Sequence, residues 1–160
     1  MPARPLDDVD RILVSALRAN ARATYAELAK LAGLSAPSVH DRVNKLEASG
    51  VLTGYHAAVA PVAVGLGVSA LVGIYQSDRD DCEGIDERLA QLPEIEDCFF
   101  VAGDEAYVVK VRVADVDALE HTLARLRRIP GVARTRTTVV LSTRWEGRIP
   151  MPEVPAPPGD

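Results

Sequence analysis

The stretch that decides the fold is TYAELAKLAGLSAPSVHDRVNKLEASG, residues 24–50 of the 160. Thr24 followed three residues later by Glu27 is the pattern of a capping box, which predicts the start of a helix. Gly33 ends that helical pattern, and Ser35 can cap a further helix. The apolar side chains spaced to face inward from this further helix are Val39, Val43 and Leu46. Two helices with so short a turn are typical of a helix-turn-helix, although any small helical bundle shares this periodicity.

The residues on either side of this stretch extend the pattern. An apolar stripe precedes it at helical spacing, formed by Val9, Ile12, Leu13, Ala16 and Leu17. Asp7 can cap this first helix, and acidic residues in its first turn suit the positive end of the helix dipole. Gly50 is placed to end the last helix, and residues 51–56 are short and β-prone, as in a wing or a connecting strand.

The second half of the chain alternates between strand and helix patterns. The predicted strands are 68–75, 95–102, 107–113 and 135–143, and the helical patterns between them run over 85–92 and 116–126. This βαββαβ order predicts a ferredoxin-like domain, an antiparallel sheet with helices on one face, and hence an α+β fold overall. The predicted organisation is a helix-turn-helix domain at 1–54, a linker at 55–67, a sheet domain at 68–145 and a Pro-rich tail at 146–160.

Charge is distributed unevenly along the chain. Residues 1–60 carry 7 Lys and Arg against 6 Asp and Glu, whereas residues 61–160 carry 11 against 17. The overall net charge of -5 argues against a protein that coats nucleic acid generally. Only the first half is a plausible place for a surface that faces phosphate.

The cysteines and the apolar segments indicate a protein without metal or membrane span. Cys82 and Cys98 have neither CxxC spacing nor a nearby pair of histidines, so we expect no metal site, no cofactor and no disulfide framework. The N-terminus lacks the apolar core of a signal peptide. The longest uncharged apolar stretch, 57–75, is interrupted by Pro61 and glycines and makes a poor membrane span. These features fit the cytoplasm.

Several short motifs in this order resemble the Lrp/AsnC (feast/famine) family of transcription regulators. They are LDDVDRIL at 6–13, ELA at 27–29, GLS at 33–35, VHDRVNKLE at 39–47, GVLTGY at 50–55, VAGDEAY at 101–107 and PGVARTRT at 130–137. Each motif is weak alone, but the match runs from about Leu6 to Thr143. The resemblance implies a winged helix-turn-helix followed by a ferredoxin-like (RAM/ACT-like) domain, in a regulator that senses a small molecule. It also implies homodimers that assemble into octamers and an association with the nucleoid.

The helix after Ser35 is the one expected to enter the major groove of duplex DNA. Arg42 can donate two hydrogen bonds to guanine, and Ser38 or His40 can reach other base edges. Ser35, at a helix N-terminus, and Lys45 are better placed for phosphate. The alternative is a solvated helix face in which Asp41 pairs with Lys45. Asp41 repels phosphate, so we expect it to point away from DNA or to hold Arg42.

The turn formed by Gly103, Asp104, Glu105 and Ala106 is the predicted effector site. Its backbone amides could hold a ligand carboxylate, and the resemblance places the hydroxyls of Thr135 and Thr137 nearby. Many family members have an acidic residue where this chain has Ala106, which removes a partner for a ligand ammonium group. Glu105 could substitute, or the effector could differ from leucine-like amino acids. The alternative interpretation is an ordinary hairpin turn followed by β-prone threonines.

The sequence therefore predicts a DNA-binding transcription regulator whose DNA binding or assembly responds to an effector, most simply an amino acid. Three alternatives stay open. An architectural protein of the same fold would compact DNA with little preference for sequence. A regulatory module would bind an amino acid and act on a protein partner. An enzyme would need a nucleophile beside a base, a carboxylate pair or a metal cluster, and no such pattern is visible, so we expect no catalytic residues.

Overall fold

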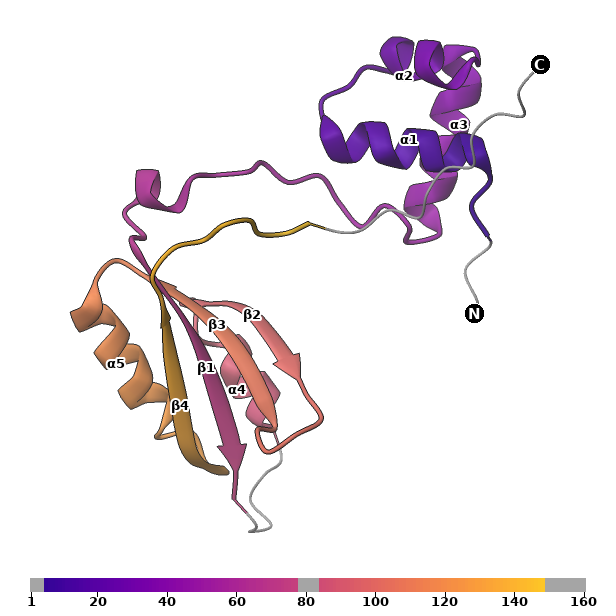
Figure 1. The fold of residues 1–160 in the computed structure, drawn as a ribbon. Helices are drawn as coiled ribbons and strands as arrows, with labels where there is room; N and C mark the ends of the chain where they lie inside the picture. The colour runs from indigo at the N-terminus through magenta and orange to yellow at the C-terminus, as the bar shows by residue number, and fades with distance from the viewer. Residues whose placement is uncertain (1–4, 78–83, 149–160) are drawn as a thin grey trace. The chain divides into compact units, whose positions relative to one another are not determined.

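The computed structural model describes residues 5–77 and 84–148. These residues form two compact units, one up to Ala58 and one comprising Val59–Glu146 (Figure 1). Each unit has its own hydrophobic core. We call them the helical unit and the sheet unit. Of the predicted Pro-rich tail, residues 149–160 lie outside the described residues. Within the described ranges, no helix is both long and apolar enough to cross a membrane.

The helical unit contains three short helices, each beginning at its predicted cap. They are α1 (Asp8–Ala19), α2 (Tyr25–Ala32) and α3 (Ala36–Ala48). The side chains of Asp7, Thr24 and Ser35 each accept a hydrogen bond from the backbone N–H three residues later. Such caps satisfy N–H groups that have no partner inside the helix, and each contributes about 0.5–2 kcal/mol to stability.

The tight connection between α2 and α3 produces the predicted helix-turn-helix. Gly33 has φ of +66°, in the left-handed region that favours glycine, and the N–H of Leu34 returns to the carbonyl of Ala29 at 3.0 Å. The chain can therefore reverse within three residues. The side chains that pack between the helices are Leu13, Leu17, Leu28, Val39, Val43 and Leu46.

Helix α3 ends in a turn closed by two backbone hydrogen bonds. The N–H groups of Gly50 and Val51 donate to the carbonyls of Glu47 and Leu46, both at 2.9 Å, in a Schellman arrangement. The wing or connecting strand predicted at residues 51–56 is not found, because this segment pairs with no strand in the described part of the chain. Its β-prone residues lack a partner strand, and the segment runs as an irregular connection to a 3₁₀ helix, Pro61–Val64.

The sheet unit has the predicted βαββαβ order. Its elements are β1 (Val68–Gln76), α4 (Ile85–Ala90), β2 (Ile95–Phe100), β3 (Tyr107–Val113), α5 (Val116–Leu126) and β4 (Val132–Val140). The strands pair antiparallel in the order β2-β3-β1-β4, so β2 and β4 form the two edges. The last strand starts three residues before the predicted Thr135, because Val132 already pairs with Gln76 immediately after the Gly131 turn.

The two helices of the sheet unit cover one face of the sheet, and the other face is open. Alternate residues of β1 and β3 pack against the two helices in one core. From the strands it includes Val72, Ile74, Val109 and Val111, and from the helices Ile85, Leu89 and Leu126. The residues between them point to the open face, where Leu71 and Phe99 are exposed. This open face also carries Tyr75 and Arg136, which contact Glu105 of the turn between β2 and β3.

Candidate nucleic-acid interface and effector loop

Helix α3 presents a polar outer face opposite its buried stripe. Val39, Val43 and Leu46 are almost completely buried in the core of the helical unit. The exposed polar side chains of the same helix are Ser38, His40, Asp41, Asn44, Lys45 and Glu47. A rigid helix with one anchored side and one exposed polar side is the element that helix-turn-helix proteins insert into the major groove.

The N-terminus of α3 carries the two predicted serines side by side. The Oγ of Ser35 accepts from the backbone N–H of Ser38 at 3.3 Å, and the two hydroxyls lie 2.8 Å apart. Both residues are exposed. The hydroxyls therefore lie where the helix dipole and the first backbone N–H groups favour an anion such as phosphate.

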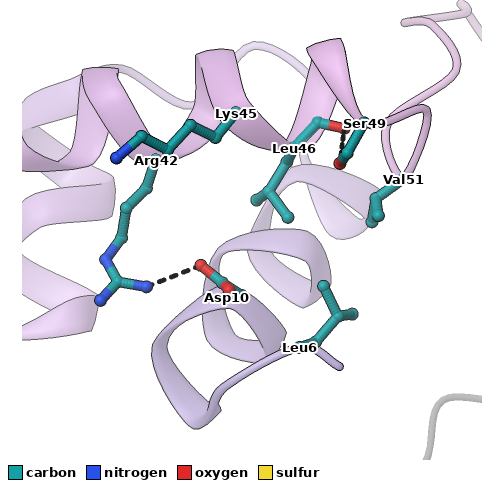
Figure 2. A pocket seen from close by; sticks show the side chains of 7 residues that line it. All are labelled: Leu6, Asp10, Arg42, Lys45, Leu46, Ser49 and Val51. Atoms are coloured by element: carbon teal, nitrogen blue, oxygen red, sulfur yellow. Dashed lines mark hydrogen bonds and ion pairs between the residues drawn. The ribbon is translucent and has the colours of Figure 1, made fainter. Parts of the chain in front are cut away.

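Arg42 occupies a different place from the predicted one. Its guanidinium points toward α1 and donates from Nη1 to Asp10 Oδ1 at 2.8 Å (Figure 2). The same nitrogen donates to Asp7 Oδ2 at 2.7 Å. The exposed fraction is 32% for the Arg42 side chain and 10% for that of Asp10. The hydrogen bond to Asp7, and to a smaller extent that to Asp10, raises the pKa of Arg42 above its ordinary value. Arg42 thus links α3 to α1 in this structure, and its guanidinium does not face outward as the sequence analysis expected.

A cavity of about 340 Å³ lies beside this link, between α1 and α3 (Figure 2). Its walls are formed by Leu6, Asp10, Arg42, Lys45, Leu46, Ser49 and Val51. Lys45 borders the cavity, but its side chain is exposed and has no ion-pair partner among the described residues, Asp41 included. The ammonium of Lys45 is therefore not engaged by another side chain in the part of the protein that the structure describes.

His40 is held by neighbours from two helices. Its ring lies edge-to-face with that of Tyr25, with the ring centroids 5.1 Å apart. Its Nδ1 lies 3.3 Å from the Asn44 amide nitrogen and 3.7 Å from a carboxylate oxygen of Asp41. Sequence reasoning did not select Tyr25, because the first residue of α2 meets α3 only in the folded unit.

The predicted effector turn forms the connection between β2 and β3. The N–H of Val101 donates to the carbonyl of Ala106 at 3.0 Å, and the N–H of Ala106 donates to Ile74 of β1 at 2.9 Å. Gly103 and Asp104 are exposed at the tip of the turn. An open hollow of about 600 Å³ lies against the turn and is lined by Gln76, Phe100 and residues 101–106.

Glu105 leaves this turn and reaches across the sheet. Its Oε1 accepts from the Tyr75 hydroxyl at 3.0 Å and pairs with Arg136 of β4 at 2.6 Å. The side chain is 16% exposed, and the hydrogen bond from Tyr75 lowers its pKa, helped by the charge of Arg136. The expectation that Glu105 substitutes for a missing ligand-binding carboxylate does not fit this geometry, since Glu105 already has protein partners.

Gly73 makes this crossing possible. A Cβ at position 73 would stand 2.8 Å from the Cγ of Glu105, closer than real Cβ contacts. Beside it, the guanidinium of Arg134 lies 3.4 Å from the centre of the Tyr75 ring, a cation–π contact. The glutamate thus lies in a slot that only a glycine on β1 leaves open.

The structure does not bring Thr135 and Thr137 to the effector turn. Both lie on β4, and neither lines the hollow beside the turn. Thr135 accepts a hydrogen bond from Nε of Arg127 at 3.3 Å. In the described ranges, no cluster of three or more His, Cys, Asp and Glu side chains is arranged to hold a metal ion.

Comparison with known proteins identifies relatives of both units. Residues 6–47 match the family model of the AsnC-type helix-turn-helix domain, and residues 69–150 match that of the Lrp/AsnC ligand binding domain. The chain is 47% identical over 147 residues to the HTH-type transcriptional regulator LrpA of Mycobacterium tuberculosis, covering 92% of this chain and 97% of that protein. It is 34% identical over 137 residues to the regulatory protein AsnC of Escherichia coli K12, covering 85% and 90%.

A solved structure agrees with the fold over most of the chain. The feast or famine regulatory protein of M. tuberculosis, complexed with L-methionine, superposes with a TM-score of 0.88 at 47% identity. That match covers 92% of this chain and 100% of the other. Both units thus have the architecture of one family.

We predict that Arg42→Ala destabilises the helical unit by about 1–3 kcal/mol, because it leaves the nearly buried carboxylate of Asp10 without its cation. Urea denaturation followed by circular dichroism measures this. The control Arg22→Ala, at an exposed position, should change stability by less than about 0.5 kcal/mol. A double-mutant cycle with Asp10→Ala should show coupling between the two side chains. Coupling near zero would contradict the link.

We also predict that part of the acid sensitivity of the sheet unit comes from Glu105. Its pKa in the folded protein lies below the ordinary value of 4.5. The contribution of the ionised Glu105 to the stability of the fold is therefore complete at pH values above 4.5. It is lost as the pH falls through the lower pKa of the folded protein. Between pH 6 and pH 3, the melting temperature of wild type should fall more than that of Glu105→Gln. Parallel curves for the two proteins would refute this prediction.

Proposed function

Since this chain belongs to the Lrp/AsnC family of transcriptional regulators, we propose that it binds duplex DNA sequence-specifically through α3 and responds to an amino acid through its sheet unit. The observation that carries the proposal is the outer face of α3, exposed and polar along its length on a helix anchored by a buried apolar stripe. Such a helix is complementary to the major groove in width and in hydrogen-bonding capacity.

Contacts with phosphate would position α3 on the duplex. The hydroxyls of Ser35 and Ser38 lie at the positive end of the helix, and Lys45 supplies a cation without a protein partner in the described part of the chain. His40, exposed on the same helix and in contact with Tyr25 of α2, would contact a base edge. Arg42 contributes indirectly by holding α3 against α1.

Two copies of α3 would be needed for tight binding. The helical unit carries almost balanced charge, so a single copy gains little from phosphate neutralisation. Pairing two helical units raises the effective concentration of the second α3 and requires half-sites about one helical turn apart. We propose that the sheet unit makes the homodimer, which assembles further to an octamer, and that the protein resides with the nucleoid in the cytoplasm.

The open face of the sheet supports this assignment. The cations Lys110 and Arg112 on β3 are only 11–12% exposed, because each contacts both Glu96 and Glu146. Burial raises the pKa of Glu96, but the hydrogen bonds from the two cations outweigh it and lower the pKa overall. A face whose charges are paired internally, beside exposed apolar side chains, can be covered by another copy at modest desolvation cost.

The effector site we propose is the turn from Gly103 to Ala106. Its exposed backbone can approach a ligand carboxylate, and the relative's L-methionine complex makes an α-amino acid the first class to test. Glu105 is already engaged by Tyr75 and Arg136, and position 106 is an alanine. We therefore assign Asp104, the remaining acidic side chain of this turn, to the ammonium group of the ligand.

Replacement of Lys45 tests the DNA-binding proposal. Lys45→Ala should weaken binding to the protein's own promoter region about uniformly across sequences and reduce the slope of log K against log salt by about 1. Fluorescence anisotropy over a range of salt concentrations measures both. Lys45→Arg keeps the charge and should restore affinity. Equal wild-type affinity for promoter and random DNA would instead favour an architectural protein.

Thermal shift against the twenty amino acids tests the effector proposal. Any ligand that prefers the folded state raises the melting temperature, so we expect a rise with at least one amino acid. Asp104→Asn should reduce that rise, whereas Asp117→Asn, in the first turn of α5, should not. If no amino acid shifts wild type, amino-acid sensing is refuted while the DNA-binding proposal stands.

A further inference from the structure

Asp41 lies at the centre of the outer face of α3. It is displaced by about 200° around the helix from the buried Val39, at about 100° per residue. Its side chain is 75% exposed. A carboxylate at this position is unexpected on a surface that approaches DNA, because it is repelled by phosphate.

The structure leaves this carboxylate uncommitted. Arg42, the neighbouring cation that the sequence suggested for it, is turned toward Asp7 and Asp10. Lys45 forms no ion pair with it in the described part of the chain. The ionisable side chain beside it there is His40, whose Nδ1 lies 3.7 Å away, beyond hydrogen-bonding distance. The carboxylate of Asp41 can therefore accept hydrogen bonds from a molecule that binds to the outer face of α3.

The major groove offers few donors to such an acceptor. The amino groups of cytosine N4 and adenine N6 are the donors among the base edges. Adenine presents the acceptor N7 beside its amino group, which repels a carboxylate, whereas cytosine presents no acceptor there. A carboxylate at the centre of a recognition helix thus favours cytosine.

Asn44 extends the same surface. It lies three residues after Asp41, so the two side chains are neighbours on one face of the helix. Its amide nitrogen lies 3.3 Å from His40, whose ring contacts Tyr25 of α2. An amide can both donate to N7 and accept from N6 of adenine. The contact through His40 to α2 limits the orientations open to Asn44.

We infer that Asp41 and Asn44 determine the sequence specificity of this chain, with Asp41 accepting from a cytosine amino group and Asn44 pairing with a nearby adenine. The inference rests on the proposed DNA-binding function and assigns base recognition to residues other than Arg42. Repulsion from phosphate makes Asp41 costly at any sequence that lacks the cytosine, which sharpens discrimination.

Selection of binding sites from a library of random duplexes tests the inference. The full-length wild type, Asp41→Asn, Asn44→Ala and Glu47→Gln are compared under the same salt conditions. Glu47→Gln is the matched control, because it removes one negative charge from α3 as Asp41→Asn does, at a residue whose carboxylate accepts from the Tyr55 hydroxyl. Circular dichroism verifies that each variant is folded.

We expect wild type to select a cytosine in each half-site. In Asp41→Asn the preference for cytosine at that base pair should fall by on the order of 5- to 150-fold. In Asn44→Ala the preference for a nearby adenine should be lost. Glu47→Gln should retain the wild-type site. If wild type binds selectively and Asp41→Asn selects the same site, the inference is overturned but the proposed function stands. Binding by wild type without sequence preference overturns the proposed function as well.

Discussion

The orientation of α3 depends on how its inner side is held. Val39, Val43 and Leu46 are buried against α1 and α2, and Arg42 adds an ionic link to Asp7 and Asp10 near the start of α1. The two attachments differ in character. Apolar packing supplies most of the stabilisation but tolerates small rotations, whereas a guanidinium shared by two carboxylates restricts direction. Together they determine which side chains of α3 face outward.

A second constraint acts in the sheet unit. Glu105 starts in the turn between β2 and β3 and ends against Arg136 on β4, crossing β1 where Gly73 has no side chain. The turn that we propose to bind the effector is thus tied to the open face that we propose to pair copies of the chain.

Several features were predictable because they depend on residues close in sequence. The caps at Asp7, Thr24 and Ser35 act within one helical turn, and apolar periodicity reports which side of each helix is buried. The βαββαβ order followed from the same local patterns. The strand expected at residues 51–56 failed because a strand requires a partner, and β-propensity alone does not supply one.

What the sequence by itself determined was the three helices of the first unit, the βαββαβ order of the second and the family to which they point, since propensity, capping and periodicity act over a few residues. What only the tertiary structure decided was the partner of each charged side chain. Arg42 turned to Asp7 and Asp10, more than thirty positions away, and Glu105 turned to Arg136. Ion pairs form between groups that the fold brings together, and spacing along a chain does not encode that proximity.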